Sequence, residues 1–211
     1  MTILYLHGFA SGPQSTKGVA FEQHFAARGI VIECMNLRVP SFEHLRLSAM
    51  IDTVRASIPG DGPAILIGSS LGGLTAARVA ERDPRVRALI LLAPAFQLVA
   101  RWREQLGAEW DAWRASGTRE VDDYMTRGKS HIDFGFVEDV QAIDLGYPDV
   151  RVPTLILHGT GDEVVPIERS RTFAADRPWV RLVELADGHE LVASLPVLLA
   201  ESEAFLARHA S

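Results

Sequence analysis

The chain has 211 residues, of which 47% are hydrophobic, and a formal net charge of −6 at pH 7. This length favours one domain over residues 1–211, and the negative charge argues against nucleic-acid binding, which favours a basic face. No stretch reaches the roughly 18 apolar residues that a membrane span needs, so we expect none. The single cysteine, Cys34, cannot form an internal disulfide, and we expect a cytoplasmic protein.

Short apolar runs alternate with helix-like segments along the chain. We expect strands near residues 2–7, 30–35, 63–68, 87–92, 153–158 and 180–185. Helices are expected from Ser15 to Gly29, from Leu47 to Ile58, from Leu71 to Arg82 and over residues 194–209. This alternation predicts an α/β fold, with a mostly parallel sheet of about six strands and helices on both faces.

The first expected strand ends in His7-Gly8-Phe9. This position brings the next backbone N–H, that of Phe9, to the edge of the sheet where ligands bind in open parallel sheets. We expect His7 to hold this loop through hydrogen bonds. On the following helix, Lys17 is interpreted as a surface charge or a clamp for a local loop.

Residues 68–72 read Gly-Ser-Ser-Leu-Gly and lie between an apolar strand run and a helix-favouring segment. A G-x-S-x-G pattern on a strand-to-helix turn is a nucleophile elbow, in which glycines permit the cramped backbone that exposes one serine hydroxyl. The positive end of the helix dipole also favours negative charge there. The pattern therefore predicts Ser70 as a nucleophile.

Residues 95–138 form an insertion between the fourth and fifth expected strands, too long for a simple crossover. The positions Val99, Trp102, Leu106, Trp110 and Trp113 follow helical spacing, and Ile132, Phe134 and Phe136 alternate as in a strand or hairpin. We expect a small cap beside Ser70, with Trp102, Trp110 and Phe134 lining an apolar substrate pocket. The alternative is that this apolar stripe only packs against the body of the domain.

The last two expected strands are each followed by a polar residue that serine chemistry needs. Asp162 comes after the fifth strand and His189 after the sixth. The chain order Ser70, Asp162, His189 is that of an α/β-hydrolase triad. Taken singly, Asp162 could cap a helix and His189 could be a turn residue. Glu163 is a weaker candidate for the acid, and Asp187 is expected to shape the turn.

These residues together predict acyl transfer by a serine hydrolase. Ser70 would attack, His189 would act as the base, and Asp162 would orient the imidazole. We assign the oxyanion donors to the backbone N–H groups of Phe9 and Leu71. We expect no metal site.

The chain resembles the α/β-hydrolase superfamily, in particular its small serine esterases and the palmitoyl-protein-thioesterase-type abhydrolases. Four blocks carry the resemblance: residues 3–17, 65–77, 154–166 and 186–190. It implies hydrolysis of small-molecule carboxylic esters or thioesters through an acyl-enzyme, without a cofactor. The leading antiparallel hairpin of larger hydrolases is expected to be missing. The same triad could instead act on another bond, as in C–C hydrolases and cofactor-free haloperoxidases, or the chain could be a binding protein on a hydrolase scaffold.

Overall fold

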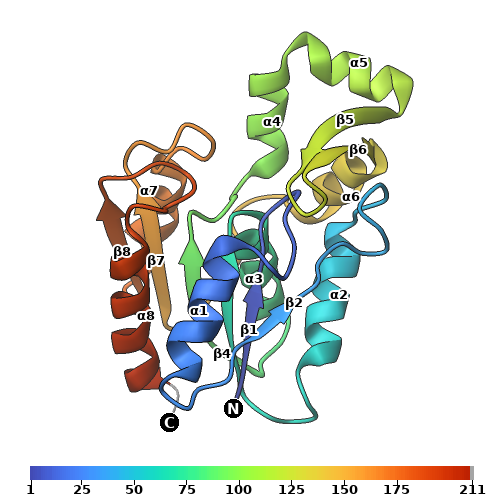
Figure 1. Cartoon of the computed structure of the whole chain (residues 1–211). Helices are drawn as coiled ribbons and strands as arrows, with labels where there is room; N and C mark the ends of the chain where they lie inside the picture. The colour runs from blue at the N-terminus through green and yellow to red at the C-terminus, as the bar shows by residue number, and fades with distance from the viewer. Residues whose placement is uncertain (210–211) are drawn as a thin grey trace.

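A parallel β-sheet forms the centre of the computed structural model, which describes residues 1–209 (Figure 1). Its strands are β1 (Thr2–Leu6), β2 (Glu33–Met35), β3 (Ala64–Ser69), β4 (Val86–Leu92), β7 (Thr154–Gly159) and β8 (Val180–Leu185). Their order is β2–β1–β3–β4–β7–β8, and every neighbouring pair is parallel. The predicted α/β fold with six parallel strands is confirmed, although the second strand is shorter than expected and pairs with β1 through three residues.

Helices cover both faces of this sheet (Figure 1). The helices are α1 (Thr16–Ala26), α2 (Leu47–Ser57), α3 (Leu71–Ala80), α7 (Glu168–Ala175) and α8 (Leu195–His209). Strand side chains point alternately to the two faces, so Tyr5 packs with Phe21 of α1, whereas Leu6 belongs to the cluster that includes α2 and α3. As predicted, Ser15 caps α1, because its Oγ accepts a hydrogen bond from the Gly18 N–H at 3.2 Å.

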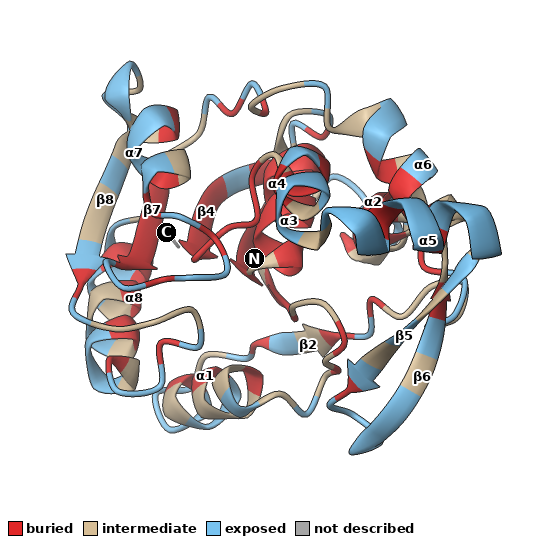
Figure 2. Cartoon of the chain, turned by 90° about the horizontal axis from the view of Figure 1, so that it is seen from above, coloured by how far each residue is buried: buried red, intermediate tan, exposed pale blue. Residues whose placement is uncertain are grey.

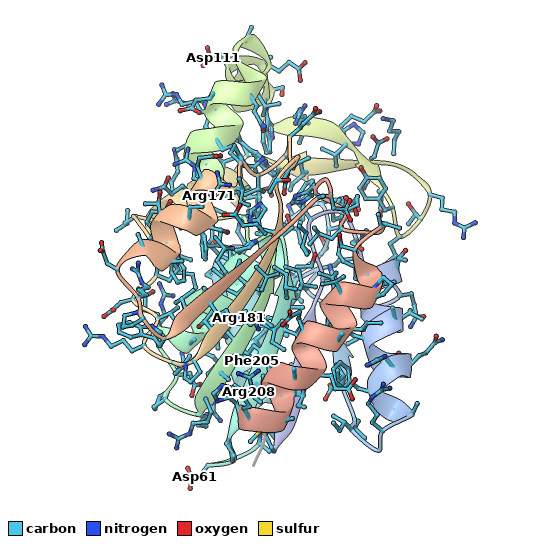
Figure 3. All side chains as sticks on the ribbon, turned by 90° about the vertical axis from the view of Figure 1, so that its left-hand side faces the viewer. Asp61, Asp111, Arg171, Arg181, Phe205 and Arg208 are labelled. Carbon is cyan, nitrogen blue, oxygen red and sulfur yellow. The ribbon has the colours of Figure 1, made fainter. Side chains whose placement is uncertain are left out.

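The sheet is most buried at its centre and most polar at the β8 edge. Every residue of β3 and β7 is buried, whereas β8 has one buried residue. Figure 2 shows this contrast between β7 and β8. On β8, Arg181 pairs with Glu201 of α8, and Glu184 pairs with Arg171 of α7; Figure 3 shows both arginines at this side of the molecule. These charged pairs protect the edge strand from pairing with another strand.

An insertion between β4 and β7 lies above the carboxyl ends of the strands (Figure 1). It contains α4 (Leu98–Leu106), α5 (Ala108–Ser116), the antiparallel strands β5 (Thr118–Asp123) and β6 (Gly128–Asp133), and α6 (Gly135–Ile143). The hairpin is fastened to the body by two ion pairs, Arg38 with Asp123 at 2.7 Å and Arg46 with Asp133 at 2.7 Å.

Two details of the expected insertion are wrong. The tryptophan stripe does not lie on one helix, because Gly107 adopts φ 51° and ψ −117° and separates α4 from α5. The alternation at Phe134 and Phe136 is not a strand, since β6 ends at Asp133. Asp133 Oδ1 accepts the Phe136 N–H at 3.2 Å, so this carboxylate caps the start of α6.

Candidate active site

The three predicted triad residues lie on loops at the carboxyl edge of the sheet. Ser70 follows β3, Asp162 follows β7 and His189 follows β8. Because all six strands are parallel, these three loops leave the same edge of the sheet, the position where open α/β sheets bind ligands. The insertion stands above this edge (Figure 1).

Ser70 occupies a strained turn between β3 and α3. Its φ of 52° and ψ of −114° are rare for a residue with a side chain, and its hydroxyl does not cap the helix. A Cβ at Gly72 would overlap the backbone carbonyl of Leu6, so only glycine lets α3 approach β1 this closely. The Ser70 N–H donates to the Leu92 carbonyl at 2.9 Å, which anchors the turn to β4.

A continuous chain of hydrogen bonds connects the three side chains. His189 Nε2 lies 3.0 Å from Ser70 Oγ, and His189 Nδ1 lies 2.7 Å from Asp162 Oδ2. The carboxylate can only accept, so the Nδ1 proton points to Asp162 and Nε2 is left to accept the serine proton. The structure thus brings together the three residues that the sequence predicted.

Asp162 is a buried carboxylate with several donors. Its Oδ1 accepts the Val164 N–H at 2.8 Å and the Val165 N–H at 2.7 Å. Burial alone would raise the pKa of Asp162, but hydrogen bonds from His158, His189 and the Val165 N–H hold it well below its usual range. Asp162 therefore stays ionised as the partner of His189.

The two rival carboxylates make other contacts. Asp187 accepts the Gly188 N–H at 2.7 Å and the Ser194 N–H at 2.8 Å, so it shapes the turn that carries His189. Glu163 is exposed, although it follows Asp162 directly.

His158 is the site residue whose contact with the acid was not predicted. Its ring is fully buried at the end of β7, and its Nε2 lies 3.1 Å from Asp162 Oδ2. Its position at the end of a strand indicates by itself no more than a local hydrogen bond. The available signal was the spacing of four residues to Asp162 across a glycine-containing turn.

The loop after β1 is held by His7, as expected. Its Nδ1 lies 2.8 Å from the Gly8 carbonyl, and its Nε2 accepts the Leu37 N–H at 3.0 Å. Burial lowers the pKa of His7 and so favours the neutral ring that this pattern requires. Among residues 1–209, the backbone N–H groups of Phe9 and Leu71 donate to no protein acceptor, so both are free for a ligand.

Lys17 clamps the loop that carries His189. Its Nζ donates to the Glu190 carbonyl at 2.7 Å and lies 3.6 Å from the Glu190 carboxylate. Its side chain is only 11% exposed, so the clamp interpretation fits better than that of a solvated charge. The contact joins α1 to the residue that follows His189.

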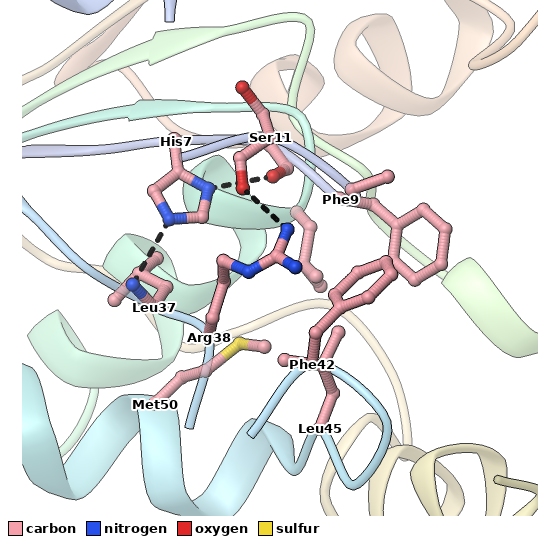
Figure 4. Close-up of a pocket in the computed structure, with 11 residues that line it drawn as sticks. His7, Phe9, Ser11, Leu37, Arg38, Phe42, Leu45 and Met50 are labelled. Carbon is pink, nitrogen blue, oxygen red and sulfur yellow. Dashed lines mark hydrogen bonds between the residues drawn. The ribbon is translucent and has the colours of Figure 1, made fainter. Parts of the chain in front are cut away.

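Aromatic side chains surround Phe9. Its ring lies 5.2 Å from Trp102, 5.9 Å from Phe42 and 6.0 Å from Phe136, measured between centroids. A small pocket lies beside Phe9 and is bounded by His7, Leu37, Arg38, Phe42, Leu45 and Met50 (Figure 4). The Arg38 guanidinium stacks 4.0 Å from the centre of the Phe42 ring.

The other two predicted pocket residues lie in a second aromatic cluster. Trp110 lies 5.5 Å from Phe134 and 6.3 Å from Trp113, again between centroids. Trp113 lies 6.0 Å from Trp102, which connects this cluster to the one around Phe9. Trp102 is thus the predicted pocket residue that contacts the loop of Phe9.

The described residues also limit other kinds of site. Within residues 1–209, no group of three or more His, Cys, Asp or Glu side chains is placed to hold a metal ion. None of the described helices combines the length and apolar character needed to cross a membrane.

Comparison with known proteins agrees with this architecture. A family model described as an uncharacterised protein family (UPF0227) matches residues 2–200. The chain is also similar to the mitochondrial palmitoyl-protein thioesterase ABHD10 of Mus musculus. The two are 27% identical, and the alignment covers 93% of this chain and 74% of the relative.

Solved structures show the same fold. The mouse alpha/beta hydrolase domain-containing protein 10 has a TM-score of 0.80 at 23% identity and covers 98% of this chain and 90% of its own. Est1E of Butyrivibrio proteoclasticus with bound ferulic acid has a TM-score of 0.81 at 23% identity, with coverages of 99% and 88%. These similarities show that the chain has the α/β-hydrolase fold.

Proposed function

The chain belongs to the uncharacterised protein family UPF0227 and has the α/β-hydrolase fold, and we propose that it is a serine hydrolase of carboxylic esters or thioesters. The observation that carries this proposal is the hydrogen-bond chain from Ser70 through His189 to Asp162 at a strained strand-to-helix turn. A structural role for these residues would not require a serine at positive φ whose hydroxyl leaves its own helix uncapped.

In the first half of the proposed reaction, Ser70 Oγ attacks the carbonyl carbon of the substrate. His189 Nε2 takes the serine proton, and Asp162 stabilises the imidazolium through Nδ1–H. The carbonyl π electrons move to the oxygen, which becomes an oxyanion. The free N–H groups of Phe9 and Leu71 donate to this oxyanion, a stabilisation of about 3–4 kcal/mol per donor in well-studied cases.

The intermediate then collapses to an acyl-enzyme. The bond to the leaving oxygen or sulfur breaks, and His189 returns its proton to give the free alcohol or thiol. In the second half, His189 removes a proton from water as the hydroxide attacks the acyl carbon. The ester bond to Ser70 Oγ breaks, the proton returns to Ser70, and the carboxylic acid leaves. These steps use groups of this chain and water, so we expect no cofactor.

The aromatic surroundings of Phe9 support a small to medium apolar acyl group as substrate. Trp102, Phe42 and Phe136 approach the Phe9 ring, and the Phe9 N–H is a proposed oxyanion donor, so an acyl chain on Ser70 would lie beside apolar surface. The thioesterase name of the mouse relative and the ferulic acid bound to Est1E support thioesters and esters as substrate classes. Because the mouse relative is described as mitochondrial, the cytoplasmic location stays a prediction.

A chain-length series of p-nitrophenyl esters and acyl thioesters tests this function, together with covalent labelling by a fluorophosphonate. We expect turnover of both substrate types and labelling of the wild type, with both lost in Ser70→Ala. Labelling without turnover of any ester or thioester would support Ser70 as the nucleophile but show that the enzyme acts on another type of bond. Absence of labelling in a folded wild-type protein would refute the serine hydrolase.

A further inference from the structure

His158 contacts the same carboxylate oxygen of the triad acid as His189. Its Nε2 lies 3.1 Å from Asp162 Oδ2 and 2.8 Å from the Val165 carbonyl, and its Nδ1 lies 2.8 Å from Ser170 Oγ. Both His158 and Ser170 are fully buried. Asp162 Oδ2 is therefore shared between two histidine rings.

The partners determine which nitrogen of His158 carries a proton. Nε2 faces a carboxylate and a carbonyl, which can only accept, so Nε2 must be a donor. In the neutral ring Nδ1 is then an acceptor, and the Ser170 hydroxyl, which can rotate, donates to it. Ser170 on α7 therefore fixes the tautomer and orientation of His158, as outer hydrogen-bond partners commonly do for functional histidines.

We propose that His158 is a positioning residue that acts through Asp162: its Nε2–H donates to Oδ2 and limits how strongly this carboxylate attracts the proton of His189. The carboxylate gives part of its accepting capacity to His158, so it stabilises the protonated His189 ring less than a free carboxylate would. Without His158, Oδ1 would remain fixed by the Val164 and Val165 N–H groups. Asp162 would then stay beside His189 and attract its proton more strongly.

Other charged groups also face this chain of contacts. Glu184 on β8 acts on His158, whereas Arg101 on α4 and Lys17 on α1 act on Asp162. Lys17 is in turn surrounded by Glu190 and Asp187. All of these remain in a His158 variant, so their effects cancel when the variant is compared with the wild type.

The test is a pH titration of the His189 ring by NMR in the wild type, His158→Leu and His158→Gln. We expect the midpoint to rise by about half a pH unit or more in His158→Leu, which has no donor. Gln carries an amide N–H near the place of Nε2, so His158→Gln should restore the wild-type midpoint. Phe173→Leu is the matched control: it weakens the packing of α7, where Phe173 is stacked 4.5 Å from Phe96, and should leave the midpoint unchanged.

The kinetic consequence rests on the proposed hydrolase function. The acid limb of the kcat/KM profile should move to higher pH in His158→Leu, which corresponds to about a threefold loss on that limb for half a unit. The NMR titration does not need turnover, so an inactive wild type would refute the function without deciding the role of His158.

An unchanged His189 midpoint in folded His158→Leu would overturn the proposal, as would an equal shift in Phe173→Leu. If His158→Leu does not fold, Ser170→Ala serves instead. It removes the donor to Nδ1 and should shift the midpoint in the same direction by a smaller amount, and no shift there would overturn the proposal.

Discussion

Replacement of Asp162 by asparagine should abolish most of the activity while it preserves the shape of the site. The amide has one accepting oxygen, and the Val164 and Val165 N–H groups at 2.8 and 2.7 Å require an acceptor at the Oδ1 position. The amide NH₂ then takes the place of Oδ2, which lies 2.7 Å from His189 Nδ1. His189 must therefore turn its unprotonated nitrogen to this NH₂ group and place its proton on Nε2, facing Ser70.

A histidine in this tautomer cannot accept the serine proton. The same change in a well-studied triad lowers kcat by about 10⁴-fold, equivalent to about 5.5 kcal/mol of transition-state stabilisation. The NH₂ would also face the donor Nε2–H of His158, so we expect a loss of folding stability of about 1–3 kcal/mol from unmatched buried donors.

The assay is kcat and KM for a p-nitrophenyl ester, with thermal unfolding of the same preparations to confirm the fold. The control is Glu163→Gln, which neutralises the exposed neighbouring carboxylate and should retain wild-type kcat. More than a tenth of wild-type kcat in folded Asp162→Asn would refute the tautomer reasoning. A severe loss in Glu163→Gln alone would identify Glu163 as the acid.

Ser70→Ala and His189→Ala should each lower kcat by about 10⁶-fold, with little additional loss in the double variant, because triad members act as a unit. Near-wild-type turnover in either single variant would show that this residue does not belong to the triad. Burial lowers the pKa of His7 in the folded chain below its ordinary 6.5, so the ring takes up a proton more readily in the unfolded chain. The free energy of unfolding should therefore be highest above pH 6.5 and decrease as the pH falls below it. Urea unfolding from pH 8 to 5 should show this decrease in the wild type and a smaller one in His7→Gln, and equal slopes would contradict the assignment. Trp102→Ala should reduce the preference for longer acyl chains, which is at most about 0.8 kcal/mol per methylene. Trp110→Ala should mainly lower the free energy of unfolding. Unchanged chain-length profiles in both variants would show that Trp102 does not line the substrate pocket.

The local features of the fold were readable because they depend on short-range physics. Apolar runs with strand character predicted the six strands, and Ser15 predicted the start of α1. The elbow was equally local, since the cramped backbone at Ser70 needs small neighbours such as Gly72. The insertion was less predictable. Helical spacing runs unbroken through Gly107, and only the positive φ of this glycine shows that the chain turns there.

The sequence by itself determined the strand-to-helix pattern, the position of Ser70, and the order in which Asp162 and His189 follow it. The tertiary structure decided which carboxylate faces His189 and that a second histidine, His158, shares Asp162 with it. Periodicity and backbone sterics act over a few residues, so they can be read along the chain. Contacts between loops depend instead on the order of β3, β7 and β8 across the sheet and on the backbone N–H groups that orient each carboxylate. Only the folded chain brings these loops together.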